Sequence, residues 1–161
     1  MKTSQFVLAA CVALAACSEE PAKEMPAVPA APAVTRDMLG GRDVGLAALS
    51  MTWGPGMEVF GKTQSEVFLS PTVGNATDQA VNDPWMRCLV GNHAQNPALV
   101  TLQLKGVVPV GGTATFPDTR TGWLDDKTGD VSCAVLAEEP APSSGPNRAP
   151  EGAIPATKPV N

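Results

Sequence analysis

The chain has 161 residues with 11 basic and 16 acidic side chains, a formal net charge of −5, and 43% hydrophobic residues. Nucleic-acid backbones and anionic lipid head groups are bound by clustered Lys and Arg, whereas the basic residues here are scattered singly among acidic ones. These features argue against a nucleic-acid partner and are typical of a chain with one modest globular domain.

The first 16 residues have the composition of an export signal. Lys2 supplies a positive charge, residues 6–14 form a short apolar run, and Ala15 and Ala16 are the small residues that a signal peptidase requires. The apolar run is too short to cross a bilayer as a resident helix. We therefore predict that residues 1–16 are removed on export.

The segment Leu14-Ala15-Ala16-Cys17 resembles the lipobox of bacterial lipoproteins. The resemblance implies that the Cys17 thiol carries a diacylglyceryl group, that cleavage precedes Cys17, and that membrane lipid is a partner through this acylated residue. Two or three acyl chains hold a protein on a membrane stably. Ser18, where inner-membrane retention commonly uses Asp, favours the outer membrane of a bacterial cell envelope, with the domain facing the periplasm or the surface. An ordinary cleaved signal with a free cysteine is the alternative.

Residues 17–36 are predicted to be a Pro/Ala-rich tether that follows the lipidated cysteine. They show no hydrophobic period that could build a buried face. As a flexible coil, a segment of this length has an end-to-end distance of about 24 Å. Prolines recur along it at Pro21, Pro26, Pro29 and Pro32.

Residues 37–137 are predicted to form one β-rich domain. Residues 44–53 fit a helical stripe and a strand equally well, so that segment stays ambiguous. Residues 57–60 and 66–69 flank a glycine-containing loop at 61–65, which is typical of a hairpin. Further strand patterns lie at residues 85–90, 99–105, 107–110, 113–116, 122–124 and 131–136. About seven or eight short strands predict an all-β fold, either a β-sandwich that is immunoglobulin-like in outline or a small barrel.

Two cysteines, Cys88 and Cys133, are left to the mature domain, because Cys11 leaves with the signal and Cys17 is modified. In an oxidising compartment they are expected to pair as a disulfide. Closing that loop is worth about 4 kcal/mol in the chain-entropy model. Each cysteine lies on the apolar face of a predicted strand, so we expect the bridge to connect the two layers through the core. Two free buried cysteines are the alternative.

Residues 138–161 are predicted to be a disordered Pro-rich tail. They lack a hydrophobic period and contain Pro140, Pro142, Pro146, Pro150, Pro155 and Pro159. A partner-binding peptide is the alternative, although no proline motif has the flanking aromatic or basic anchor that recognition modules require.

No cofactor and no metal site are predicted. Asp125, Asp126 and Asp130 lie close together, but their order does not match a calcium-binding loop. His93 lies in a polar loop without a recognisable catalytic partner. Asn75-Ala76-Thr77 has the pattern of a glycosylation acceptor, which we interpret simply as a turn.

The three tryptophans, Trp53, Trp85 and Trp123, are the candidate surface for a ligand or partner. Tryptophans at strand ends can stack on sugars or anchor a protein partner. A domain with few other large side chains also needs them for packing, and we favour packing.

The favoured function is that of a non-enzymatic, lipid-anchored envelope protein that binds another envelope protein or contributes to an assembly. One alternative is a periplasmic binder of glycans or small ligands that uses its tryptophans, and another is an inhibitor of a lysozyme or protease. The least favoured alternative is a cell-wall enzyme, which needs convergent carboxylates such as Glu58, Glu66 or Asp118.

Overall fold

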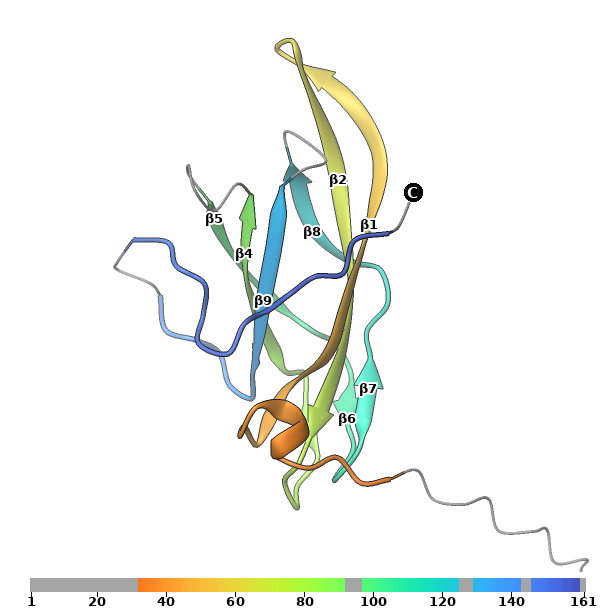
Figure 1. Ribbon diagram of the computed structural model, residues 1–161, viewed down its shortest axis with the longest axis vertical. Helices are drawn as coiled ribbons and strands as arrows, with labels where there is room; N and C mark the ends of the chain where they lie inside the picture. Colours follow the sequence, from red (N-terminus) through yellow and green to blue (C-terminus); the bar gives the residue numbers. More distant parts are fainter. Residues whose placement is uncertain (1–31, 92–96, 125–128, 143–145, 160–161) are drawn as a thin grey trace, which may run out of the picture. The chain divides into compact units, whose positions relative to one another are not determined.

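The computed structural model describes residues 32–91, 97–124, 129–142 and 146–159 (Figure 1). In these ranges the chain forms ten β-strands and one short 3-10 helix, η1 (Asp37–Leu39). The all-β prediction is therefore confirmed. The ambiguous segment at residues 44–53 lies entirely within a strand, because its alternating side chains pack against a sheet on one side only.

The first sheet is built on a long antiparallel hairpin of β1 (Val44–Val59) and β2 (Lys62–Asn75). The other side of β2 pairs with two shorter strands. β7 (Thr113–Thr115) pairs near the end of β2, and β8 (Thr119–Leu124) pairs near its start.

The second sheet has the order β10-β9-β4-β5 and is antiparallel throughout. Its strands are β4 (Trp85–Gly91), β5 (Ala98–Gln103), β9 (Asp130–Leu136) and β10 (Ile154–Pro155). A small separate ladder joins β3 (Val81–Asn82) to β6 (Val107–Val108).

The two sheets pack face to face around one hydrophobic core, as a sandwich requires. Along β2 the side chains from Gln64 to Val73 alternate between half-buried and buried, so one face of the first sheet is turned inward. The core includes residues of both sheets that are almost completely inaccessible to solvent, namely Met51, Val67, Leu69, Val73, Met86, Cys88, Cys133 and Val135. The described strands form a sandwich and not a closed barrel.

The β1–β2 hairpin turns more tightly than the predicted five-residue loop. Val59 pairs with Lys62, so the turn consists only of Phe60 and Gly61, with φ angles of 50° and 75°. Positive φ at both central residues is the signature of a type I′ turn. The polar residues at 62–65, which led us to predict a loop, pair instead with residues 56–59 of β1. A type I′ turn needs only two residues, so the ladder continues up to it.

Cys88 and Cys133 form the predicted disulfide, with an S–S distance of 2.04 Å. They lie directly opposite each other on adjacent strands, β4 and β9, with Cα atoms 4.0 Å apart. The prediction that this bridge connects the two layers is therefore wrong. Both cysteines point inward from the same sheet, and an alternating pattern reveals the buried face of a strand without revealing its neighbour.

The structure differs from the predicted disordered tail at residues 154–157. Ile154 pairs with Cys133 as part of β10. The N–H of Thr157 donates to Leu49 O at 2.9 Å, and the N–H of Met51 donates to Thr157 O at 3.1 Å. The tail thus bonds to the edges of both sheets, and its path past β9 toward β1 is visible in dark blue in Figure 1. Short hydrogen-bonded contacts of this kind need no hydrophobic period in the sequence.

Candidate interaction surface at the hairpin tip

The chain enters the domain at the end of β2 that is opposite to the hairpin turn. The N–H of Val34 donates to Gly111 O at 2.8 Å, and the N–H of Asn75 donates to Gly112 O at 3.0 Å. The first and last of the 14 residues of β2 are separated by 13 steps of about 3.3 Å, or roughly 43 Å. Figure 1 shows the hairpin reaching beyond the other strands at the far end from this entry.

Three large apolar side chains are exposed at this far end, which we call the tip patch: Met57, Phe60 and Trp123. Their exposed fractions are 49%, 103% and 37%. Met57 pairs with Gln64, and Trp123 pairs with Glu66. Because Gln64 and Glu66 both alternate with buried residues of β2, Met57 and Trp123 lie on the outer face of the first sheet, on either side of β2.

The polar surroundings of Trp123 are held in place by an ion pair. Arg120 Nε contacts Glu66 Oε1, and the Glu66 side chain is only 14% exposed. Phe68, the next outward residue of β2, pairs with Arg120 across the ladder. The tip patch therefore lies next to the ion pair of Arg120 and Glu66. This ion pair in turn lies next to Phe68.

The three tryptophans lie in separate places and do not form one platform. Trp53 is half-buried on β1 and packs against the core. Trp85 is half-buried on β4, in the second sheet, while Trp123 belongs to the tip patch. Sequence reasoning missed Met57 and Phe60 as surface residues. The usable signal was an apolar residue immediately before Gly61 in a predicted hairpin, since a residue in the turn has no sheet to cover it.

Trp85 borders a shallow cavity of about 490 Å³ on the outer face of the second sheet. Arg87 lies beside it, with Nε donating to Thr101 Oγ1 at 3.4 Å and Nη2 donating to Ala141 O at 2.7 Å. Tail residues thus form one wall of this cavity. Its lining consists of Trp85, Arg87, Leu99, Thr101, Glu139, Pro140, Pro142 and Asn147.

The candidate carboxylates do not converge. Glu58 pairs with Thr63, on the opposite face of the ladder from Glu66, and Glu66 is bonded to Arg120. Asp118 is exposed in the turn before β8. Within the described ranges, no group of three or more His, Cys, Asp or Glu side chains is placed to bind a metal ion.

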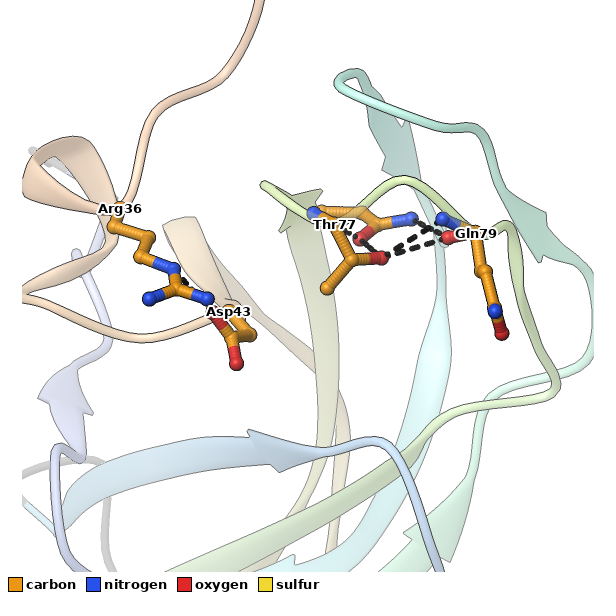
Figure 2. Close-up of polar contacts among 5 residues, drawn as sticks. Arg36, Asp43, Thr77 and Gln79 are labelled. Carbon is orange, nitrogen blue, oxygen red and sulfur yellow. Dashed lines mark hydrogen bonds and ion pairs between the residues drawn. The ribbon is translucent and has the colours of Figure 1, made fainter.

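The Asn75-Ala76-Thr77 segment begins at the buried last residue of β2 and continues into a half-buried bend. The Asn75 side chain is inaccessible to solvent, and its Nδ2 donates to Gln79 O at 2.7 Å and to Pro109 O at 3.2 Å. Its Oδ1 accepts the N–H of Thr77 at 3.0 Å. Figure 2 shows Thr77 and Gln79 in this loop, near the ion pair of Arg36 with Asp43. An amide with these partners holds the loop closed and is inaccessible to a glycosylating enzyme in the folded domain.

Asp83 is a second polar anchor near the entry end. Its backbone has a φ of 46°, and its Oδ1 accepts the N–H of Gly106 at 2.8 Å. This hydrogen bond lowers the pKa of the Asp83 carboxyl, and the nearby Lys105 ammonium, 3.5 Å from Oδ2, lowers it further. The carboxylate joins the start of β4 to the segment that follows β5.

Comparisons of this chain with protein-family models, with curated proteins and with solved structures found no match. In the portion of the chain that the structure describes, no helix has the length and apolar character needed to span a bilayer. The predictions for Cys17, His93, Asp125 and Asp126 concern residues outside the described ranges.

Proposed function

We propose that this protein is a lipid-anchored protein of the bacterial cell envelope that binds another envelope protein through the tip patch. The observation that carries the proposal is the exposure of Met57, Phe60 and Trp123 together at one end of the domain. Large exposed apolar side chains that are gathered in one region with a polar border are typical of protein interaction sites on soluble domains. A fully exposed aromatic ring at a projecting turn is suited to insert into a recess on a partner.

The position of the chain entry supports a protein partner over the bilayer that carries the anchor. The tether would reach the domain at residues 32–34, beside Gly111, and the tip patch lies at the other end of β2. The tip patch thus lies roughly 43 Å from the residues at which the tether would join the domain, at the end of the domain where the tether does not enter. A partner protein can therefore reach the patch without contacting the point of entry.

Site-specific photocrosslinking in intact cells tests the proposal. A photoreactive residue at Phe60 is expected to capture a discrete second protein, and Phe60→Ser is expected to prevent co-purification of that protein. The matched control is Val110, which is 54% exposed and lies beside the chain entry. Equal capture from both positions, or capture from neither, would contradict the proposal.

The anchor has its own test. Cys17→Ser is expected to release the protein from the membrane fraction while the domain stays folded, because the strands of the sandwich are formed by residues 44–155. The measurements are incorporation of labelled fatty acid and membrane fractionation. Retention of the substituted protein on the membrane would show that the anchor assignment is wrong.

The cavity beside Trp85 supports a second candidate function, the binding of a glycan. It combines an indole ring with the hydrogen-bonding side chains of Arg87, Thr101 and Asn147, and small-ligand sites combine aromatic side chains with a few polar groups in this way. Titration of cell-wall glycan fragments is expected to quench tryptophan fluorescence in the parent chain and in Trp123→Phe, and not in Trp85→Phe. If quenching persists in Trp85→Phe, glycan binding in the cavity beside Trp85 is contradicted.

A further inference from the structure

The edge of the second sheet formed by β5 has outward-directed backbone groups. In an antiparallel ladder, alternate residues of a strand direct N–H and C=O to the same neighbour. The N–H of Leu104 donates to Pro84 O at 2.8 Å, and the register places Met86 opposite Leu102. The even-numbered residues of β5 therefore bond to β4, and the odd-numbered residues direct their N–H and C=O away from the sheet.

The first outward-directed backbone group of this edge has a hydrogen-bond partner. The backbone groups of the next three outward-directed residues have none among the described residues. Pro97 O accepts a hydrogen bond from Asn147 Nδ2 at 2.9 Å. Leu99, Thr101 and Gln103 follow, and no hydrogen bond between described residues reaches their backbone groups. Between Pro97 and Leu104, the edge thus has a row of donors and acceptors ready for another strand.

Natural proteins protect such edges with charges, prolines, bulges or a covering segment. Residues 98–103, Ala-Leu-Val-Thr-Leu-Gln, contain neither a charged residue nor a proline. Two other edges of the sandwich differ. β9 is covered by β10, which contains Pro155, and β1 carries Pro55 together with a register shift between Trp53 and Gly56. Residues 98–103 have neither a proline, nor a charge, nor a register shift that would hinder a further strand.

The side chains of β5 indicate what kind of strand fits. Val100 and Leu102 are half-buried and pack against the core from the rim of the sandwich. An added strand would cover them if it presented apolar residues at the same alternate positions. β5 itself has this pattern, with uncharged residues on its other face.

We propose that β5 pairs antiparallel with β5 of a second copy of this chain, around a two-fold axis at Thr101. In this register Thr101 faces Thr101 of the second copy, and Leu99 faces Gln103. The three outward residues of each strand then form about six backbone hydrogen bonds, and the two four-stranded sheets become one continuous sheet. Lys105 lies opposite the uncharged Pro97, so no like charges meet across the ladder.

This pairing is independent of the tip patch, which lies on the other sheet. The two proposals therefore succeed or fail separately: one predicts capture of a different protein from Phe60, and the other predicts association of the chain with itself through Thr101. A strand from another protein is the competing occupant of the β5 edge.

Cysteine crosslinking in the full-length membrane-bound protein tests the pairing. Thr101→Cys is expected to give a homodimer with a short bis-maleimide reagent, because residue 101 faces itself. Leu99→Cys and Gln103→Cys are expected to crosslink weakly alone and strongly when the two variants are co-expressed. Thr113→Cys, on exposed β7, is the matched control. A Thr101→Cys product that contains a different protein, or no product above the Thr113→Cys level, would overturn the proposal.

Charge substitutions at the axis give a second test. The Thr101 side chain is exposed, but its Oγ1 accepts a hydrogen bond from Arg87 Nε, so circular dichroism of each variant first establishes that the monomer is folded. Thr101→Lys and Thr101→Glu are each expected to weaken self-association about tenfold, because like charges then face each other. Mixing the two variants is expected to restore dimers, measured by analytical ultracentrifugation of detergent-solubilised protein. Dimerisation unchanged in either single variant, or no recovery in the mixture, would contradict a two-fold axis at Thr101.

Discussion

The two ends of the β1–β2 hairpin are built differently. At the entry end, η1 covers the ladder: Leu39 is 5% exposed and packs on the paired glycines Gly45 and Gly74. The Asn75 amide closes the adjoining loop. At the tip, Phe60 and Met57 extend into solvent with no covering segment in the described residues. One ladder thus contributes stability at one end and an exposed apolar surface at the other.

The largest expected effect in this comparison comes from Asn75→Ala. The substitution leaves the carbonyls of Gln79 and Pro109 and the N–H of Thr77 without their partner, and unsatisfied buried groups cost about 1–3 kcal/mol each. We expect the free energy of unfolding to fall by about 3 kcal/mol in urea denaturation. Thr63→Ala, an exposed polar residue near the tip, is the control and should change it by less than about 0.5 kcal/mol. Equal losses of unfolding free energy in Asn75→Ala and Thr63→Ala would show that the entry end and the tip contribute equally to stability.

Leu39→Ala compared with Met57→Ala tests the same contrast with apolar side chains. Leu39 is buried and Met57 is half-exposed, so removing Leu39 leaves a cavity and removing Met57 does not. We expect losses of about 2–3 kcal/mol and about 0.5 kcal/mol or less respectively. Thermal unfolding followed by circular dichroism measures both. A Met57→Ala loss as large as that of Leu39→Ala would show that the tip is part of the stabilising core.

Gly74→Ala is expected to destabilise the domain by about 1–2 kcal/mol through overpacking. A methyl group at Gly74 would lie 2.7 Å from Leu39 Cδ2, so one of the two must move. In the Leu39→Ala background the same substitution should cost less, because the clashing atom is gone. A double-mutant cycle measures this coupling, and strict additivity would mean that Leu39 does not pack on this glycine.

Asp83 adds a pH dependence at the entry end. Its pKa is lower in the folded domain than in the unfolded chain, because the N–H of Gly106 and the Lys105 ammonium favour the carboxylate. The stabilisation is therefore complete above the unfolded pKa of about 3.9 and is lost as the pH falls through the lower folded value. Asp83→Asn should reduce stability at neutral pH and flatten its decline below about pH 4. An unchanged acid profile would show that Asp83 does not contribute.

The smallest expected effect is that of Phe60→Ser on stability. Phe60 is fully exposed in the hairpin turn, so the substitution should change the free energy of unfolding by less than about 0.5 kcal/mol. The melting temperature should therefore change little. Partner capture should nevertheless be lost. A marked fall in melting temperature would indicate that the ring packs against the domain, and the tip patch would then be smaller than proposed.

Several local features could be predicted from the sequence. Alternation of apolar and polar residues in short segments, punctuated by Gly, Pro, Asn and Asp, indicated strands and an all-β class. The cysteine count, together with the predicted export of the chain, indicated the bridge between Cys88 and Cys133, which the structure confirms. These inferences succeed because they depend on side-chain periodicity and covalent chemistry, both of which are properties of neighbouring residues or of the count.

Relations between distant segments could not be predicted. The disulfide joins two strands of one sheet, the tail hydrogen-bonds to β9 and β1, and Phe60 is exposed at a turn. Each depends on which strand lies beside which, and an alternating pattern is equally compatible with many neighbours. The sequence by itself determined the strand class, the cysteine pair and the resemblance at Cys17. Only the tertiary structure decided strand order, and with it the tip patch and the open β5 edge, because pairing energy depends on long-range contacts that no local pattern records.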